Sequence, residues 1–322
     1  MSYAWLFPGQ GAQAVGMGKA LCEASAAARR VFERADAALG WSLSKLCFEG
    51  PDEELILTKN TQPAIVTTSV AALEALREAY PDLPPPAFAA GHSLGEYSAL
   101  VAVGALSLED AVRTVHVRGE AMQQAVPAGR GAMAAIMGGD EEAVRSLCEE
   151  ASEGDVLQPA NFNAPGQIVI AGTAPAVERA VALAKSKSLK AIPLKVSAPF
   201  HCALMEPAAR AVEQALQSVT VHPFEIPVVS NVEARANAAA ERVPELLVRQ
   251  VDSPVLWDRS ITALAEAGVT GALELGPGKV LAGLVKRIAK SITVVSVGEP
   301  QQLQDARGLA LTASGQAEAA AS

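Results

Sequence analysis

The chain has 322 residues, and its 35 acidic and 26 basic side chains give a formal net charge of −9. Half of the residues are hydrophobic and 19% are charged, which excludes an intrinsically disordered chain, and the acidic balance excludes a general nucleic-acid binder, which needs a basic surface. The sequence holds four histidines, so any histidine chemistry must use His92, His116, His201 or His222.

Short apolar runs alternate with long amphipathic stretches, a pattern typical of α/β proteins. Five of the runs are interpreted as buried parallel strands, at residues 4–7, 87–90, 227–230, 272–275 and 292–297. Turns that contain Gly, Pro or Asn follow four of them, at residues 8–11, 91–95, 231–232 and 276–278. Because ligands bind at the carboxyl ends of strands in open parallel sheets, these turns predict one shared site.

The middle of the chain has a different order of elements. It begins with a strand at 131–137, a helix at 141–151 and two strands around 159–163 and 167–171, and continues with a helix at 174–186 and a strand at 190–196. This βαββαβ order is that of a ferredoxin-like domain. We therefore predict a small ferredoxin-like domain at residues 127–198, inserted in a large α/β-hydrolase-like domain with a parallel sheet at residues 1–126 and 199–300, and a flexible tail at 301–322.

The strand at 87–90 leads into Gly-His-Ser-Leu-Gly at residues 91–95 and then into a helix at 96–104. This is the G-x-S-x-G pattern of a nucleophile elbow, in which glycines permit a sharp turn that presents Ser93 at the edge of the sheet. The following helix N-terminus offers N–H groups to a developing oxyanion. The alternative is a glycine-rich turn whose serine only caps a helix.

A serine nucleophile needs a base, because its hydroxyl is scarcely ionised near neutral pH. His201, at the junction after the small domain, is the best placed of the histidines, since His92 lies in the elbow itself, His116 in the helix at 108–124 and His222 in a polar connection. A histidine at a helix start without a catalytic part is the alternative. No acid is evident as a third member of a triad, but a backbone carbonyl can also orient an imidazole. We expect Cys202 to be a buried thiol rather than a nucleophile.

These and further segments resemble the malonyl-CoA:acyl-carrier-protein transacylase family of fatty-acid and polyketide synthesis. The matching segments are FPGQGAQ at 7–13, GHSLGEYS at 91–98, HVRG at 116–119 followed by MQ at 122–123, NFNAPGQ at 161–167, HCALM at 201–205, SNV at 230–232, Gln250 within 248–257 and ELGPG at 274–278. They follow the order of the family and span residues 5–280, which is nearly the whole chain.

The resemblance implies roles for five residues. Ser93 is the acylated nucleophile and His201 is its base, which the backbone carbonyl of Gln250 orients. The backbone N–H groups of Gln10 and Leu94 form the oxyanion hole.

The resemblance also implies that Arg118 holds the free carboxylate of a malonyl group. The planar guanidinium, which stays charged, suits that role, and an ordinary exposed helix arginine is the alternative. The acyl pocket is expected to include His92, Met122, Asn163 and Phe200.

The implied activity is transfer of the malonyl group from malonyl-CoA to the phosphopantetheine thiol of an acyl carrier protein, through malonyl-Ser93 and in fatty-acid biosynthesis, without a metal or other cofactor. Phe200 precedes the base, where many similar stand-alone members carry a small residue and malonyl-selective polyketide modules carry Phe. A trans-acting malonyltransferase of a polyketide pathway is therefore one alternative, and we expect malonyl to be preferred over methylmalonyl. A serine thioesterase or hydrolase and a non-enzymatic carrier-binding scaffold are the alternatives from other classes.

The expected partner is an acyl carrier protein, bound transiently by a monomeric enzyme. Carrier proteins are acidic, as this chain is, so docking needs a local basic patch. Two candidates exist, and we expect one of them to meet the carrier. One contains Lys185, Lys187, Lys190 and Lys195, and the other contains Lys286, Arg287 and Lys290. Solvated faces without a partner are the alternative for both.

The sequence favours the cytoplasm. No basic residue precedes the first apolar stretch, which Pro8-Gly9 cuts short, so a secretory signal is not expected. The longest apolar run, at residues 97–106, is about half of the roughly 20 residues that a membrane span needs. The four cysteines form neither a CxxC pair nor a zinc-type spacing and are expected to be reduced thiols.

Overall fold

The computed structural model describes residues 2–316 and contains two sheets. The larger sheet has the strand order β10-β9-β1-β2-β7-β8. The five predicted strands are confirmed and pair in parallel, while β8 is a two-residue antiparallel edge strand that the sequence did not predict. The strand bounds are β1 Ser2–Phe7, β2 Phe88–Gly91, β7 Val228–Val229, β8 Ala236–Asn237, β9 Val269–Leu275 and β10 Thr293–Val297.

Strand β1 lies inside the sheet and is buried on both faces. Tyr3, Trp5 and Phe7 belong to the core on one face, and Ala4 and Leu6 belong to the core on the other. This alternation follows from the two-residue period of a strand, and apolar residues on both faces are typical of parallel sheets covered by helices.

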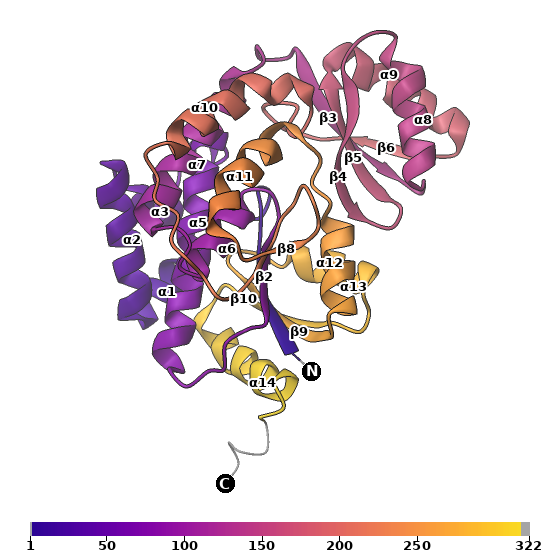
Figure 1. Ribbon diagram of the computed structural model, residues 1–322. Coiled ribbons are helices and arrows are strands. Elements are labelled where there is room, and N and C mark those ends of the chain that lie inside the picture. The colour runs from indigo at the N-terminus through magenta and orange to yellow at the C-terminus, as the bar shows by residue number, and fades with distance from the viewer. Residues whose placement is uncertain (1, 317–322) are drawn as a thin grey trace.

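Helices cover both faces of the large sheet (Figure 1). The face of Tyr3 packs with the helices α1 Lys19–Ala24, α2 Ala26–Leu39, α3 Leu43–Glu49, α4 Asp52–Leu55, α5 Thr58–Ala79, α6 Gly95–Ala102, α7 Leu108–Gln124, α10 Glu206–Leu216 and α11 Val243–Asp252. The face of Leu6 packs with α12 Trp257–Glu266 and α13 Val280–Ile288. The helix α7 has the predicted bounds, and Ser107 caps its N-terminus by accepting a side-chain hydrogen bond from the N–H of Asp110.

The second sheet lies between residues 131 and 193, inside the range expected for the small domain, and is antiparallel with the order β4-β5-β3-β6. This is the strand order of a ferredoxin-like fold. Its elements are β3 Gly131–Met137, α8 Glu141–Ser152, β4 Leu157–Ala164, β5 Gln167–Thr173, α9 Ala174–Ala184 and β6 Lys190–Pro193, so β4 and β5 are longer and β6 is shorter than the sequence suggested.

The two faces of the small sheet have different neighbours. On β3, Ala134 and Ile136 pack under α8 and α9, whereas Met133 and Ala135 join the core of the large domain. The small sheet is therefore seated on the large domain by its helix-free face (Figure 1). A cleft lies between the two, lined by residues that follow β1 and β2.

The structure differs from the predicted flexible tail at 301–322. Residues 303–313 form helix α14 (Leu303–Ala313), and its Ala306, Ala310 and Ala313 are buried against β9, β1 and α5. The alanine-rich composition, which suggested fraying, instead gives a strong helix former with side chains small enough for close packing. Gly271 on β9 allows this approach, because a Cβ there would lie 2.8 Å from Leu309 Cδ2. The prediction for residues 317–322 lies outside the described residues.

Within residues 2–316, the helices lack the combination of length and apolar character that crossing a bilayer requires.

The packing of α14 can be tested by placing a charge in its contact with β9. We expect Ala310→Asp to lower the free energy of unfolding in urea by about 3 kcal/mol, because it buries an unpaired carboxylate. Gln304→Asp, on the exposed side of the same helix, should change it by less than about 0.5 kcal/mol. Equal, small effects of both substitutions would contradict the packed helix.

Candidate active site

Ser93 lies in a sharp turn between β2 and α6 with a φ of 50°, a left-handed conformation that non-glycine residues rarely adopt. The neighbouring glycines are needed for close packing. A Cβ at Gly91 would lie 1.9 Å from the carbonyl of Gly95, and a Cβ at Gly95 would lie 2.2 Å from the carbonyl oxygen of Phe7. The turn has the geometry of a nucleophile elbow, with Ser93 at the end of the strand.

Asn231 holds this turn from the end of the neighbouring strand β7. Its Oδ1 accepts a hydrogen bond from the N–H of Ser93 at 2.7 Å, and its Nδ2 donates to the carbonyl of Gly91 at 2.7 Å. The sequence marked residues 231–232 as a turn at the sheet edge but assigned Asn231 no role. Its position after an apolar strand was the signal that could have found it.

His201 lies with its Nε2 2.8 Å from Ser93 Oγ and its Nδ1 2.8 Å from the backbone carbonyl of Gln250. Because a carbonyl only accepts, Nδ1 carries the hydrogen and Nε2 is free to accept the hydrogen of the serine hydroxyl. Burial, with the nearby Arg118 cation, lowers the pKa of His201 to about 3. The imidazole is therefore neutral at physiological pH and available as a base.

Arg118 is on the inner side of α7 and only 1% exposed, so the alternative of a surface arginine does not hold. Its Nη2 donates to Ser93 Oγ at 3.1 Å and to Gln250 Oε1 at 2.9 Å, and its Nη1 donates to Gln62 Oε1 at 2.8 Å. No carboxylate within residues 2–316 comes within 4.0 Å of the guanidinium. A buried cation thus sits directly beside the serine hydroxyl with only neutral partners.

Two more residues of this network had no assigned role. Gln62 lies within the long buried helix α5, where nothing in the sequence marks it as a partner of an arginine. Glu96 follows the elbow, is 3% exposed and accepts hydrogen bonds at Oε2 from Gln250 Nε2 at 2.7 Å and from the N–H of Asn231 at 3.2 Å. Burial raises the pKa of Glu96 to about 7.

The backbone N–H groups of Gln10 and Leu94 are both close to the serine turn. Gln10 follows β1 in the cavity wall, and Leu94 is the residue before the first turn of α6. Within the described part of the chain, neither N–H donates a hydrogen bond to a protein acceptor. Both are therefore available to an oxyanion.

A cavity of about 720 Å³ opens in front of Ser93, between the large domain and the helix-free face of the small sheet. The small sheet contributes Met133, Asn161 and Val169 to its wall. The side chains proposed for the acyl pocket all line it, namely His92, Met122, Asn163 and Phe200. His92 Nε2 lies 2.8 Å from Asn163 Oδ1, which ties the elbow to β4 of the small domain.

Three of the four predicted turns meet at this site, and the fourth packs against the segment that precedes Gln10. The turn at 276–278 is outside the cavity wall, and a Cβ on Gly276 would lie 2.9 Å from Pro8 Cγ. Its close packing on Pro8 fixes the segment that presents Gln10.

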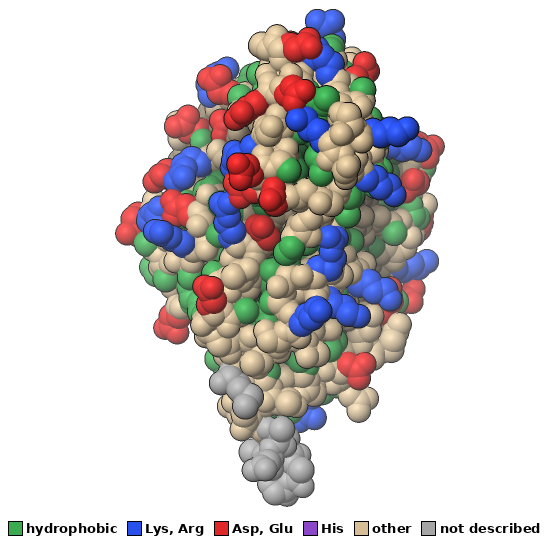
Figure 2. Space-filling model, turned by 90° about the vertical axis from the view of Figure 1, so that its right-hand side faces the viewer, with side chains coloured by type: hydrophobic (Ala, Val, Ile, Leu, Met, Phe, Trp, Pro, Cys, Tyr) green, Lys and Arg blue, Asp and Glu red, His purple; other side chains and the backbone are tan. Residues whose placement is uncertain are grey.

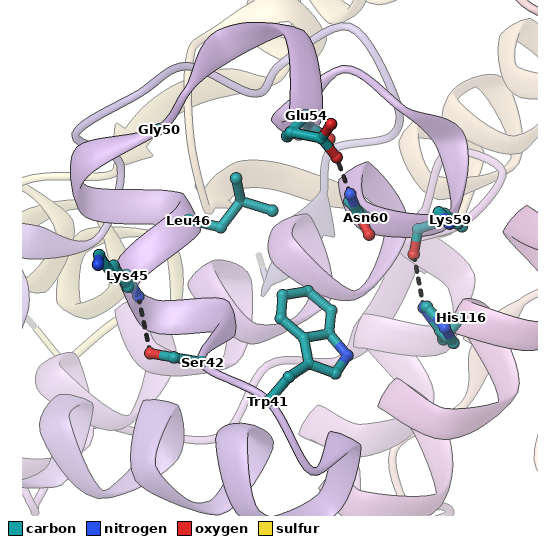
Figure 3. Close-up of a pocket in the computed structure, with 9 residues that line it drawn as sticks. All are labelled: Trp41, Ser42, Lys45, Leu46, Gly50, Glu54, Lys59, Asn60 and His116. Carbon is teal, nitrogen blue, oxygen red and sulfur yellow. Dashed lines mark hydrogen bonds between the residues drawn. The ribbon is translucent and has the colours of Figure 1, made fainter.

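His116 lies two residues before Arg118 on α7 but faces a different hollow, shown in Figure 3, which Trp41 also lines. Its Nδ1 lies 2.9 Å from the carbonyl of Lys59, and its ring lies 6.2 Å from the Trp41 ring. The other bonds drawn there join backbone to side chain, such as Asn60 Nδ2 to the carbonyl of Glu54. This hollow has no paired nucleophile and base.

The four cysteines are free and buried. Cys202 donates from Sγ to the carbonyl of Pro199 at 3.1 Å, and burial raises the pKa of its thiol to about 11, so it is a poor nucleophile despite its position beside His201. Among residues 2–316, no group of three or more His, Cys, Asp or Glu side chains is placed to hold a metal ion.

Comparisons with known proteins agree with this geometry. The family model of the acyl transferase domain matches residues 4–318. The chain is 51% identical to a malonyl CoA-acyl carrier protein transacylase of Bacillus subtilis over 305 residues, which are 94% of this chain and 95% of that protein.

Solved structures are similar in sequence and in fold. An acyl-carrier-protein S-malonyltransferase of Burkholderia pseudomallei superimposes with a TM-score of 0.92 at 45% identity, over 96% of this chain and 100% of that chain. A malonyl-transacylase solved in complex with its type II PKS acyl-carrier protein superimposes with a TM-score of 0.92 at 42% identity, over 95% and 99% of the two chains.

The protonation state of His201 can be tested with a neutral sulfonyl fluoride that labels Ser93. Because the pKa of His201 is about 3, we expect no loss of labelling rate centred near pH 6.5, the ordinary histidine value, and a level rate down to about pH 5. Arg118→Met removes a cation that lowers this pKa, so its loss of rate should begin at higher pH than in the wild type. If the labelling rate of the wild type fell with a midpoint near pH 6.5, and the midpoint were the same in Arg118→Met, the assignment of a neutral His201 would be contradicted.

Proposed function

The chain belongs to the malonyl-CoA:acyl-carrier-protein transacylase family, and from this premise we propose that it transfers the malonyl group of malonyl-CoA to the phosphopantetheine thiol of an acyl carrier protein through malonyl-Ser93. The observation that carries the proposal is the buried Arg118 guanidinium, 3.1 Å from Ser93 Oγ. A neutral acyl group offers the guanidinium no carboxylate, whereas the free carboxylate of a malonyl group can pair with it directly.

In the first half-reaction, His201 Nε2 accepts the hydroxyl proton of Ser93 as Oγ attacks the thioester carbonyl carbon. The resulting oxyanion accepts hydrogen bonds from the N–H groups of Gln10 and Leu94. When the tetrahedral intermediate collapses, the carbon–sulfur bond breaks and the CoA sulfur leaves with the proton from His201. The products are malonyl-Ser93 and CoA thiol.

In the second half-reaction, the phosphopantetheine thiol of the carrier takes the position of CoA. His201 accepts the thiol proton, the sulfur attacks the malonyl-Ser93 ester, and Ser93 Oγ leaves and regains the proton. Charges and protons balance with these groups alone. The expectation that neither a metal nor another cofactor takes part stays a prediction.

The walls of the cavity suit a short acyl group. Phe200, 9% exposed and next to the base, lines the cavity with a bulky ring, which reduces the space for an α-methyl group on the acyl chain. His92, Met122 and Asn163 form further parts of the wall. Preference for malonyl over methylmalonyl thus remains our expectation.

A hydrolase of neutral esters has no use for a buried arginine at the acyl end of its cavity, which favours transfer of an anionic acyl group. Fatty-acid biosynthesis is the proposed pathway. Phe200 and the likeness to a malonyl-transacylase solved with a type II PKS carrier keep a polyketide pathway as the second candidate.

For docking of the carrier we favour the patch of Lys286, Arg287 and Lys290 over that of Lys185, Lys187, Lys190 and Lys195. Residues 275–298 contain four basic residues and no acidic residue. Figure 2 views the molecule from the side that carries α12, α13 and the small domain, where Lys and Arg side chains gather on the right of the lower half.

The two patches also differ in their contacts with the segments that line the cavity. Arg287 donates to the carbonyl of Pro165, in the turn after β4, at 3.0 Å and to Gln167 at the start of β5. That turn follows Asn163, which lines the cavity. In contrast, Lys187 forms an ion pair with Glu150 at 2.6 Å, at the far end of the small domain. Lys195 does not belong to that patch, because it lines the active-site cavity itself.

We further propose a monomeric enzyme of the cytoplasm. The four buried free thiols are consistent with a reducing compartment.

The covalent step is tested by mixing the protein with malonyl-CoA and measuring intact mass. We expect one malonyl group per chain in the wild type and none in Ser93→Ala, because the ester needs that hydroxyl. Addition of phosphopantetheinylated carrier should remove the group from the enzyme and place it on the carrier. A mass increase that persists in Ser93→Ala, or release of free malonate instead of transfer, would contradict the proposal.

The docking patch is tested by reversing charges at Lys286 and Lys290, which leaves the structural bonds of Arg287 in place. Because steering of an acidic partner depends on these charges, we expect kcat/KM for the carrier to fall by about tenfold or more, with the malonyl-CoA half-reaction unchanged. The matched control reverses Lys185 and Lys190 and should have little effect. An equal loss in both half-reactions would instead assign the patch to the phosphates of CoA.

A further inference from the structure

Glu96 is a buried carboxyl group that the transfer steps do not use. It lies on the first turn of α6, three residues after the nucleophile, and is 3% exposed. Both of its hydrogen bonds end on Oε2, from Gln250 Nε2 and from the N–H of Asn231. A carboxylate is costly to bury unless it is paired with a positive charge and hydrogen-bonded.

The side chain of Gln250 connects this carboxyl group to Arg118. Its Oε1 accepts from Arg118 Nη2 at 2.9 Å, and its Nε2 donates to Glu96 Oε2 at 2.7 Å and to the carbonyl of Ser93 at 2.9 Å. The amide thus turns its oxygen to the cation and its nitrogen to the anion. Glu96 and Arg118 form a bridged ion pair around one glutamine.

We propose that Glu96 is the counter-charge of Arg118 in the free enzyme, and that it takes up one proton from solvent when the malonyl carboxylate binds Arg118. This inference rests on the proposed function, since it assumes an acyl group with a free carboxylate.

The charge balance of the buried site favours uptake of a proton by Glu96 when the malonyl carboxylate binds. In the free enzyme, Arg118 and ionised Glu96 sum to zero. A malonyl carboxylate on Arg118 would bring the sum to one negative charge in a site of low dielectric, and protonation of Glu96 returns it to zero. Attack by Ser93 also changes the bonds of the guanidinium, because the ester oxygen of malonyl-Ser93 is a weak acceptor and frees the Nη2 hydrogen for the carboxylate.

Glu96 has polar neighbours for both protonation states. A cavity of about 10 Å³, close to the space of one water molecule, borders Glu96, Ser230 and Asn237. The buried hydroxyl of Ser230 has no hydrogen-bond partner within residues 2–316. A water molecule in this cavity can accept from the O–H of a protonated Glu96 and donate to Ser230, while the two hydrogen bonds to Oε2 stabilise the ionised form.

Arg118 is the charged group that governs Glu96. On α6, the helix of Glu96, Tyr97 is neutral because burial raises its pKa. Tyr3 on β1 is neutral for the same reason. His201, which also faces Arg118, is neutral. The strands β2 and β7 carry no charged residue, and the remaining charged or titratable side chains of α5, α7 and α11 reach solvent, namely Lys59, Glu74, Arg77, Glu78, Glu109, Asp110, Arg113, His116, Glu120, Glu245, Arg249 and Asp252.

The proposal sets the direction of a pH effect. The pKa of Glu96 is about 7 in the free enzyme and rises when a second anion arrives. Below pH 7 the carboxyl group already holds its proton, so malonyl binding is independent of pH. Above pH 7 a proton must be taken up, and malonyl affinity falls by up to about tenfold per pH unit until the pKa of the malonyl form is passed.

The experiment follows protons during a single turnover with malonyl-CoA, in weak buffer with an indicator dye, while intact mass counts malonyl-Ser93. Acylation of a serine by a thioester consumes no proton at pH 7, because the CoA thiol, with a pKa of about 8.5, keeps its own. For the wild type we expect uptake of roughly half a proton per malonyl-Ser93 at pH 7. Between pH 7 and 8, the extent of acylation should fall relative to that of Glu96→Gln.

Three variants complete the test. Glu96→Gln can keep both hydrogen bonds with its amide oxygen, and should be malonylated without proton uptake. Glu96→Asp keeps an ionisable group and should retain uptake. Glu109→Gln removes a carboxylate that serves another arginine, Arg34, at the surface and should behave as the wild type.

Equal uptake in the wild type and Glu96→Gln, or no uptake by wild-type enzyme that becomes malonylated, would overturn the inference alone. A wild type that forms no malonyl-Ser93 would overturn the proposed function and the inference together.

Discussion

The structure of the site depends on one constraint, the burial of the Arg118 guanidinium in the wall of the acyl cavity. A permanent charge removed from water needs partners, and the chain supplies Gln62, Gln250 and the hydroxyl of Ser93. The nucleophile is therefore one of the groups that stabilise the cation. An acyl group with its own carboxylate can replace these contacts of Arg118, whereas a neutral acyl group cannot. The same cation therefore determines both the hydrogen bonds of the empty site and the preferred acyl group.

Gln250 joins segments that are far apart in the chain. Its backbone carbonyl orients His201, and its side chain bridges Arg118 of α7 and Glu96 of α6. The elbow itself is held by Asn231, at the end of the strand next to β2. Because one residue serves both the base and the cation, a displacement of α11 would disturb proton transfer and carboxylate binding together.

The sequence predicted the fold where local patterns decide it and missed the parts that depend on distant contacts. Apolar runs predict the five parallel strands, but β8 has two residues and no pattern. The alanine-rich composition of α14 suggests a flexible tail, although three of its alanines are buried against the sheet. The elbow motif identified Ser93, and Arg118 and Gln250 were found only through a family resemblance. Gln62 and Glu96 were missed, since Glu96 and Gln250 meet across 154 residues of sequence.

The central claim is that the charge of Arg118 selects the acyl group, and single-turnover acylation rates with malonyl-CoA and acetyl-CoA test it most directly in the wild type and Arg118→Met. Removing one partner of a buried ion pair costs about 3 kcal/mol, so loss of the contact between Arg118 and the malonyl carboxylate should lower the malonyl-to-acetyl rate ratio by about 100-fold in the variant, with the acetyl rate maintained or increased. An unchanged ratio in a variant that still acylates Ser93 would contradict the account.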